Sequence, residues 1–180
     1  MSIPDTALTD DLVTQIIAAS QWEQAFAKFL AAERGWHVLP TCDLHGNYAY
    51  APHFASAAGD LIVPDLLAAR DGEMKWFEVK HKSHADWHRN SHQYVTGLPA
   101  HHWDAYLRVQ ELTHTDVVIV FIHAEEGLVV GGTLKELTAH ISHRYTQSLM
   151  DKEGTLFFKF DALPRLIATA RLQKYMEAHS

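Results

Sequence analysis

The feature that most constrains the fold is an unbroken apolar segment in the second half of the chain. The run Val117-Val118-Ile119-Val120-Phe121-Ile122 contains only β-branched and aromatic residues. An apolar run of strand length without alternation is typical of a strand that is covered on both faces. Helical and strand patterns both precede and follow this run along the sequence. We therefore expect an α/β fold with a mixed central sheet flanked by helices.

Residue spacing, turn formers and capping residues predict the remaining elements. Helices are expected over residues 10–34, 99–112, 133–143 and 164–178. Strands are expected over residues 36–39, 61–69, 75–80, 128–130 and 155–160. The polar, histidine-rich segment 81–98 is expected to be a loop with some helix. The first helical segment is either one bent helix or two helices joined at a capping box formed by Ser20 and Glu23.

Composition excludes several classes of protein. Of the 180 residues, 47% are hydrophobic and 21% are charged, which provides enough apolar material for a core and excludes intrinsic disorder as the main state. Cys42 is the only cysteine, so a disulfide scaffold is excluded and a reducing compartment is favoured. No apolar run approaches the roughly 20 residues that span a bilayer. We expect one domain, residues 1–180, in the cytoplasm and without membrane association.

Charge is distributed unevenly along the chain. The formal net charge of −7 argues against a protein that coats nucleic acid without specificity. Residues 71–110 contain equal numbers of basic and acidic residues, and six of the 14 histidines fall within residues 81–102. The middle of the sequence is therefore its least negative part, and it gains positive charge first as the pH falls.

The central hairpin brings together the residues that indicate chemistry. Pro64-Asp65 lies on one expected strand and Glu78-Val79-Lys80 on the next, with a hairpin signal at Asp71-Gly72 between them. Side chains alternate along a strand, so Glu78 and Lys80 project from the same face. A carboxylate and an amine on a half-buried strand are costly unless they serve a purpose.

This combination is typical of metal-assisted phosphodiester hydrolysis. Mg²⁺, or Mn²⁺ in its place, takes one or two carboxylates together with water and phosphate oxygens. Asp65 and Glu78 would supply the carboxylates, and the backbone carbonyl of Val79 could supply a third ligand. Lys80 would orient or deprotonate the attacking water, or hold the negative charge that develops on the phosphate. A divalent ion and partial burial are both expected to lower the pKa of Lys80.

These residues resemble the motif of the PD-(D/E)XK nuclease superfamily, which has the restriction-endonuclease-like fold. Pro64-Asp65 matches the PD element, and Glu78-Val79-Lys80 matches the (D/E)XK element. Family members also carry a glutamate on the first core helix, and Glu23 is similar to it in position. The resemblance covers residues 20–123 and implies a DNA-cleaving enzyme that depends on Mg²⁺ or Mn²⁺. It implies that Glu23 joins Asp65 and Glu78 in organising the metal.

The resemblance also implies where DNA would be bound. Many members carry Gln-x-x-x-Tyr on the helix after the lysine strand; here the counterparts are His102-x-x-x-Tyr106 and Tyr106-x-x-x-Gln110, which depart from the pattern. The stretch around Glu78 to Lys82 looks similar to small phage and bacterial nucleases, including Holliday-junction-resolvase-like members. Because the chain is acidic, a homodimer or a partner protein is expected to add contact surface. The residues expected to contact DNA are His81, Lys82, His84, Arg89, Tyr106 and Gln110.

Four alternatives remain open from the sequence. Glu23 could simply close the capping box with Ser20. The chain could be a noncatalytic nucleic-acid-binding or assembly module that retains the fold. The spacing of His84, His88 and His92 would place them on one face if they were helical, which would suit a zinc protein; the histidine-rich segment could equally be a solvated loop.

Overall fold

The computed structural model describes residues 10–41, 53–54, 61–145 and 154–177, and Cys42 lies outside them. None of the helices in these ranges is both long and apolar enough to cross a membrane. The elements are, in chain order, α1 (Asp10–Arg34), β1 (His37–Pro40), β2 (His53–Phe54), β3 (Leu61–Ile62), β4 (Leu66–Arg70), β5 (Glu73–Lys82), β6 (Asp86–His88), β7 (Gln93–Pro99), α2 (Ala100–Thr113), β8 (Asp116–His123), β9 (Leu128–Thr133), α3 (Leu134–Thr138), β10 (Ile141–Tyr145), β11 (Thr155–Lys159), the 3₁₀ helix η1 (Phe160–Ala162), β12 (Arg165–Ala168) and α4 (Ala170–Glu177).

A mixed sheet of six strands forms the centre of the molecule, in the order β1-β4-β5-β8-β9-β12. β5 and β8 are parallel, and the neighbouring pairs are antiparallel. β8 contains the unbroken apolar run, and its residues alternate between two hydrophobic clusters, with Ile119 in one and Val120 in the other. The expected α/β class with a mixed, flanked sheet is confirmed, because β8 is covered on both faces.

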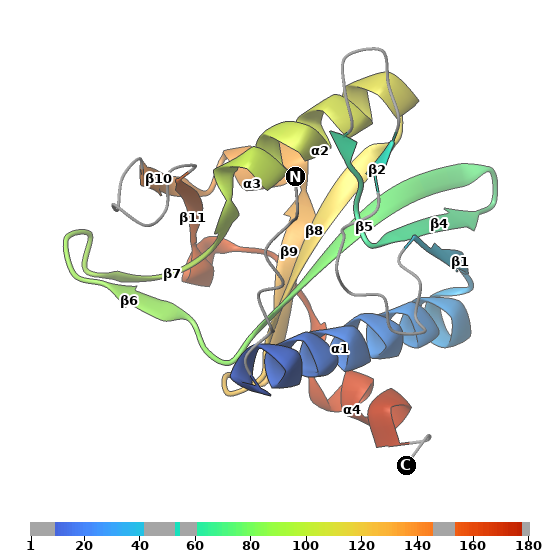
Figure 1. Cartoon of the computed structure of the whole chain (residues 1–180), viewed down its shortest axis with the longest axis horizontal. Helices are drawn as coiled ribbons and strands as arrows, with labels where there is room; N and C mark the ends of the chain where they lie inside the picture. Colours follow the sequence, from blue (N-terminus) through green and yellow to red (C-terminus); the bar gives the residue numbers. More distant parts are fainter. Residues whose placement is uncertain (1–9, 42–52, 55–60, 146–153, 178–180) are drawn as a thin grey trace, which may run out of the picture.

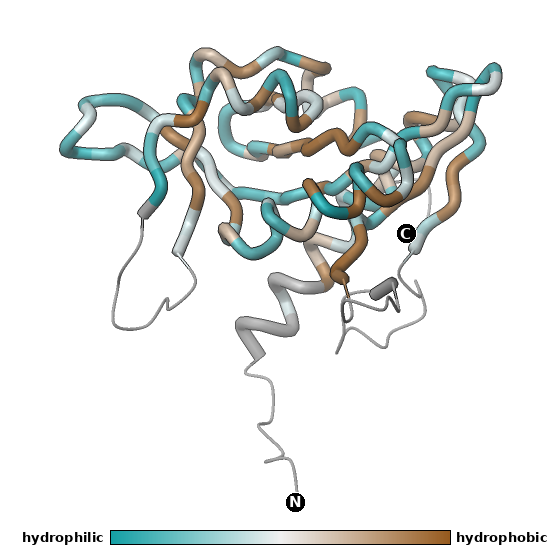
Figure 2. Tube along the Cα trace, turned by 90° about the horizontal axis from the view of Figure 1, so that it is seen from above, coloured by the Kyte–Doolittle hydropathy of each residue, from teal (hydrophilic) through white to brown (hydrophobic). Residues whose placement is uncertain are grey.

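Helices form the two covering layers (Figure 1). α1 and α4 pack on one face of the sheet, where Phe26 of α1 and Leu172 of α4 share a cluster with β8. α2 and α3 pack on the other face, where Trp103 of α2 and Leu137 of α3 belong to the second cluster. Figure 2 shows hydrophobic strand segments running through the interior between these layers. The central sheet therefore separates two hydrophobic cores, one on each of its faces.

The first helix is one continuous element rather than two. Ser20 lies in the interior of α1, buried, and accepts a hydrogen bond from the side-chain amide of Gln24. The expected capping box is therefore wrong, because a capping serine must stand outside the helix that it caps. Gly35 ends the helix with a φ of +68°, as expected. Glu23 is thus free of any capping role.

Proline and glycine shape the central hairpin. The expected strand 61–69 is interrupted at Pro64, with β3 before the break and β4 after it, because proline cannot donate a ladder hydrogen bond. The turn between β4 and β5 has positive φ at both Asp71 and Gly72, 52° and 82°. Positive φ at both central residues is typical of the type I′ hairpin turn. The hairpin predicted from these two residues is confirmed.

Three segments differ from expectation. The expected loop 81–98 instead contains the end of β5 and most of the β6–β7 hairpin, because β7 pairs with β11 and β6 pairs with β7 in a second sheet ordered β10-β11-β7-β6. The helix expected over 133–143 ends at Thr138, and β10 follows it. The helix expected from Pro164 begins only at Ala170, because residues 165–168 pair with β9 as β12. In each case a distant strand overrides the local pattern.

Candidate active site

The β4–β5 hairpin brings Asp65 against the strand that carries Glu78 and Lys80. Leu66 pairs with Phe77, and the carboxylate of Asp65 accepts a hydrogen bond from the Val79 N–H at 2.8 Å. This contact fixes the Asp65 side chain to β5. The juxtaposition follows from the turn position alone, since a shift of one residue would turn the side chains to the other face.

Thr41 holds the backbone just before β4, a contact that no sequence pattern indicated. Its hydroxyl donates to the carbonyl oxygens of Pro64, at 2.6 Å, and Asp65, at 2.8 Å. Its N–H donates to the Asp65 carbonyl as well, at 2.8 Å. Thr41 therefore holds the backbone at Pro64 and Asp65, where the chain interrupts its strand pairing.

Glu78 and Lys80 form a buried ion pair on one face of β5. Glu78 is only 1% exposed, and its Oε1 pairs with the ammonium group of Lys80. Its other oxygen, Oε2, is buried and has no hydrogen-bond partner among the described residues. A buried carboxylate oxygen without a donor is unfavourable, and such atoms are rare in folded proteins. Glu78 Oε2 is therefore available to bind a cation or to accept a hydrogen bond.

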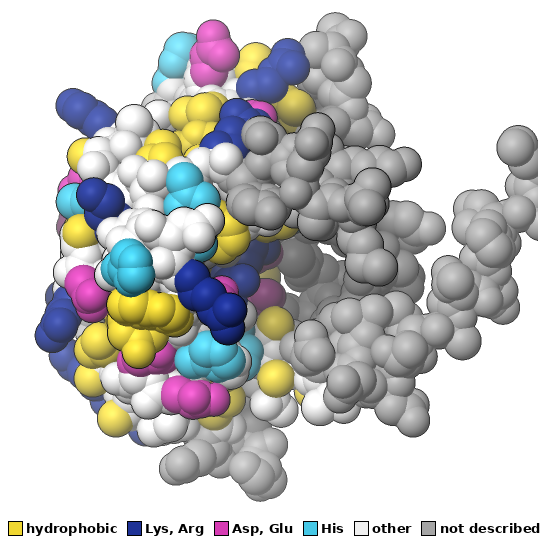
Figure 3. Space-filling model, turned by 90° about the vertical axis from the view of Figure 1, so that its left-hand side faces the viewer, with side chains coloured by type: hydrophobic (Ala, Val, Ile, Leu, Met, Phe, Trp, Pro, Cys, Tyr) yellow, Lys and Arg dark blue, Asp and Glu magenta, His cyan; other side chains and the backbone are white. Residues whose placement is uncertain are grey.

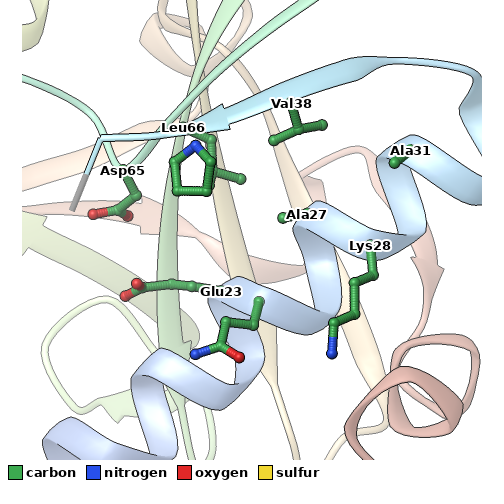
Figure 4. Close-up of a pocket in the computed structure, with 9 residues that line it drawn as sticks. Glu23, Ala27, Lys28, Ala31, Val38, Asp65 and Leu66 are labelled. Atoms are coloured by element: carbon green, nitrogen blue, oxygen red, sulfur yellow. The ribbon is translucent and has the colours of Figure 1, made fainter. Parts of the chain in front are cut away.

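Glu23 reaches the same region from α1. Glu23 and Asp65 line one pocket of about 270 Å³ between α1, β1 and the start of β4. Figure 4 shows their carboxylates at the same end of this pocket, Glu23 extending from the helix and Asp65 from the segment before β4. The remaining walls are mostly apolar, with Ala27, Val38 and Leu66 among them. Glu23 and Asp65, which are far apart in sequence, thus lie close together beside β5.

Crowding of carboxylates raises their pKa values. Burial, assisted by the charge of Glu78 and opposed by Lys80, raises the pKa of Glu23 to about 7. Burial, together with the charges of Glu78 and Glu23, raises the pKa of Asp65 well above its ordinary value, although Lys80 and the Val79 N–H act against this. The single Lys80 cation does not compensate three neighbouring carboxylates.

Lys80 differs from expectation in the metal-free protein. Burial acts to lower its pKa, but the charges of Glu78, Asp65 and Glu23 outweigh burial and raise the pKa above its usual value. The expectation of a lowered pKa included a divalent ion. Without that ion the negative charges of the three carboxylates stabilise the ammonium form of Lys80, so its proton is held more tightly.

The donor set suits a hard divalent cation with few protein ligands. Within the described ranges, no group of three or more His, Cys, Asp and Glu side chains is gathered closely enough to hold a metal by itself. Asp65 and Glu78 nevertheless offer carboxylate oxygens, and Glu78 Oε2 has no donor among the residues in these ranges. Mg²⁺ is usually held by one or two carboxylates, with water and phosphate oxygens completing its shell. The residues present therefore fit Mg²⁺ or Mn²⁺.

The residues expected to bind DNA beyond Lys80 lie along the chain that leaves β5. His81 stacks on Trp22 of α1, with ring centroids 5.6 Å apart, and burial lowers its pKa. Burial also lowers the pKa of Lys82, at the end of β5. His84 and Arg89 are exposed, His84 before β6 and Arg89 in the turn after it. These four residues thus lie at the end of β5 and along the segment up to the turn of the β6–β7 hairpin.

Tyr106 and Gln110, also expected to contact DNA, both form hydrogen bonds within the fold. Tyr106 is 1% exposed, and its hydroxyl contacts His102 Nδ1 at 3.0 Å. Gln110 accepts a hydrogen bond from the Val117 N–H at 3.0 Å, which ties α2 to the start of β8. His102 lies nearer the site: burial, aided by the charge of Lys80, lowers its pKa to about 4. The side chains of Tyr106 and Gln110 thus make contacts within the fold, and DNA contact by either residue stays a prediction.

The suggested zinc face of histidines does not form. His84, His88 and His92 lie on a loop, a strand and a turn rather than on one helix. The His88 ring stacks on His143, with centroids 4.0 Å apart, and its Nδ1 contacts Ser91 Oγ at 2.7 Å. The helical arrangement on which the zinc hypothesis depended is wrong, because residues 86–88 and 93–99 are strands joined by a turn.

The raised pKa of Glu23 predicts a pH-dependent gain in stability when its charge is removed. A carboxyl group whose pKa is higher in the folded state favours folding below pH 4.5, and this contribution is lost as the pH rises through about 7. In EDTA, Glu23→Gln should therefore match the wild type near pH 4.5 and exceed it at pH 8, by up to about 3 kcal/mol. Urea unfolding at both pH values measures the difference.

Glu33, on the same helix, is the matched control. The Lys174 side chain, which donates to Glu33, holds the pKa of this carboxyl below its usual value. The effect of Glu33→Gln should consequently have the opposite sign, with the variant losing stability relative to the wild type as the pH rises. A Glu23→Gln variant that is no more stable at pH 8 than the wild type would show that Glu23 is solvated rather than crowded.

Comparisons with known proteins bear on the fold. No protein-family model matches the chain, and no curated protein matches it by sequence. Among solved structures, Hjc, a Holliday junction resolvase from the archaeal hyperthermophile Archaeoglobus fulgidus, matches with a TM-score of 0.51 and 10% identity, over 87% of this chain and 96% of that one. D212, a nuclease from a fusselovirus, matches with a TM-score of 0.44 and 8% identity, over 96% and 95%. The mixed sheet, its two helical layers and the similarity to Hjc identify the restriction-endonuclease-like fold.

Proposed function

We propose that this protein is a nuclease that hydrolyses DNA phosphodiester bonds with Mg²⁺ or Mn²⁺. The observation that carries the proposal is a cluster of charged side chains beside β5, formed by Glu23, Asp65, Glu78 and Lys80. Three carboxylates crowd around one lysine, two of them with raised pKa values, and one buried oxygen of Glu78 has no hydrogen-bond partner in the part of the chain that the structure describes. Such a cluster of like charges is unfavourable by itself and would become favourable when a divalent cation neutralises it.

Each residue of the cluster has a distinct role in this proposal. Asp65 and Glu78 hold the metal, with the Val79 carbonyl as a further ligand and Glu23 bound directly or through water. The metal supplies Lewis-acid activation of the phosphate and lowers the pKa of water. The Val79 N–H keeps Asp65 oriented at 2.8 Å. Lys80, anchored by Glu78, orients the attacking water or holds the negative charge that develops on the phosphate.

DNA would reach the cluster along the outgoing end of β5. Lys82, His81, His84 and Arg89 provide donors for phosphate oxygens, and such contacts position a duplex without reading its sequence. Because the formal net charge is −7, one copy of the chain provides little positive surface. We propose that a homodimer or a partner protein completes the DNA-binding surface. Sedimentation of the protein with and without DNA measures this.

The test of the nuclease is cleavage of a labelled panel of DNA molecules. The panel contains a linear duplex, a closed circle, a single strand and a four-way junction; the junction is included because Hjc is a Holliday junction resolvase. Cleavage by the wild type that requires Mg²⁺ or Mn²⁺ and stops in EDTA supports the proposal, and the preferred substrate defines the class. No cleavage of any substrate, together with no uptake of either metal by calorimetry, would instead identify a noncatalytic DNA-binding or assembly module.

A further inference from the structure

The β6–β7 hairpin presents two large aromatic side chains to solvent. Trp87 is 51% exposed and Tyr94 is 47% exposed. The two residues are directly opposite in the strand register, and their rings meet edge to face with centroids 5.1 Å apart. His92, in the turn, lies against the same tryptophan at 6.4 Å. Neither Trp87 nor Tyr94 belongs to a hydrophobic core cluster of the described residues, so the fold does not require them as packing groups.

The hairpin continues directly from the strand that carries the candidate active site. β5 ends at Lys82, two positions after Lys80, and β6 begins at Asp86. In Figure 1 the hairpin extends beyond the end of β5, away from the two helical layers. A DNA strand that occupies the site at Lys80 and leaves along β5 would therefore pass the aromatic pair.

Charge on this segment favours an anionic partner. Residues 82–99 contain Lys82 and Arg89 against a single acidic residue, Asp86, which gives a formal charge of +1 in a chain of net charge −7. Figure 3 views the side of the molecule from which the hairpin projects, and shows hydrophobic side chains next to Lys, Arg and His side chains, with Asp and Glu side chains among them. Exposed aromatic rings interleaved with cations are typical of surfaces that bind single-stranded nucleic acid.

We infer that Trp87 and Tyr94 stack on unpaired bases of the DNA strand beside the cleavage site. This inference rests on the proposed nuclease function and narrows its substrate class to DNA with a single-stranded or unpaired segment next to the scissile bond. Bases inside a duplex hide their faces, whereas unpaired bases offer faces on which aromatic rings stack regardless of sequence. A second copy of the chain fits this surface less well than DNA does. Stable protein interfaces bury about 800 Å² on each partner, whereas β6, one of the two strands of the hairpin, has only three residues.

DNA binding in EDTA tests the inference without requiring cleavage. The probes are a fluorescently labelled blunt duplex and the same duplex with a single-stranded tail, followed by anisotropy. Trp87→Ala should bind the tailed duplex about ten-fold more weakly than the wild type, as expected for the loss of one base–aromatic stack. Its affinity for the blunt duplex should be unchanged. Trp87→Phe retains an aromatic face and should recover most of the affinity for the tail.

Met74→Ala is the matched control, because Met74 is 48% exposed at the opposite end of β5. It should bind both probes like the wild type, and thermal unfolding should show that all three variants are folded. Equal affinity of the wild type and Trp87→Ala for the tailed duplex, including no binding by either, would overturn the inference. So would the loss of a dimer in Trp87→Ala by sedimentation, which would make the hairpin a protein interface. A tail-specific loss in a protein that cleaves nothing would support the stacking surface while refuting the nuclease.

Discussion

Replacing Lys80 with alanine should abolish metal-dependent DNA cleavage and also destabilise the folded protein. The ammonium group of Lys80 pairs with Glu78, a carboxylate that is 1% exposed. Removing one partner of a buried ion pair leaves an uncompensated charge, which typically costs about 3–5 kcal/mol. Loss of a group that stabilises developing negative charge typically lowers the rate by a factor of about 10²–10³. Cleavage rate and urea unfolding in EDTA measure the two effects.

A second variant separates the fold from the chemistry. Replacing both partners, as Glu78→Leu with Lys80→Met, removes the buried charge together with its counterion. The free energy of unfolding should then recover most of the loss, since apolar residues of similar volume often replace a buried ion pair without penalty. Cleavage should remain absent. Lys82→Ala, on the same strand, should leave stability unchanged and weaken DNA binding only. A Lys80→Ala protein that cleaves DNA at the wild-type rate would place the catalytic site elsewhere.

The central features of the fold could be predicted because their signals are local. The run Val117–Ile122 indicates a strand covered on both faces without reference to any partner. Asp71 and Gly72 tolerate the positive φ that a tight hairpin requires, so their position sets the register of β4 against β5. Once the register is known, the approach of Asp65 to Val79 follows. The pairing of the two motif elements is thus a consequence of turn chemistry.

Other parts of the fold depend on partners that the local sequence does not reveal. The β6–β7 segment is polar and has no clean alternation, and it becomes a hairpin because Val95 pairs with Lys159, far along the chain. β12 likewise forms because residues near Ile167 pair with Val129 of β9. Non-local pairing of this kind depends on the whole sheet, so a window of neighbouring residues indicates loop or helix instead.

The residues of the candidate site likewise include some that the local sequence predicts and some that depend on distant contacts. Glu78 and Lys80 share a face by strand alternation, which the sequence predicts directly. The approach of Glu23 needs α1 to pack beside β5, and the expected role of Glu23 came from the family resemblance alone. Thr41 reaches the region only through the folded chain, and no spacing indicates it. The sequence singles out His102 only as part of a counterpart that departs from the family's Gln-x-x-x-Tyr pattern, and the effect of Lys80 on its pKa follows from the folded chain. Residues contributed by a separate element therefore remain difficult to assign from one sequence.

Asp65→Asn should abolish cleavage while making the metal-free protein more stable. Burial and the neighbouring carboxylates raise the pKa of Asp65 well above its ordinary value, so its ionised form disfavours the folded state. Its contribution to stability is present at low pH and is lost as the pH rises through the folded-state pKa. Asparagine carries no charge, and its side-chain oxygen can still accept the hydrogen bond from the Val79 N–H. At pH 8 in EDTA the variant should therefore unfold at a higher temperature than the wild type.

The metal response decides whether Asp65 acts as a ligand. A ligand that binds only the folded state raises its stability, so Mg²⁺ or Mn²⁺ should raise the melting temperature of the wild type and leave Asp65→Asn nearly unchanged. Loss of about 4 kcal/mol of metal-dependent transition-state stabilisation would lower the cleavage rate about 10³-fold. Asp104→Asn is the control: Asp104 forms an exposed ion pair with Arg144 at 3.0 Å, and such pairs contribute about 0–1 kcal/mol. An Asp65→Asn protein that keeps the metal-induced stabilisation, or that is less stable than the wild type in EDTA, would show that Asp65 supports the hairpin rather than a metal site.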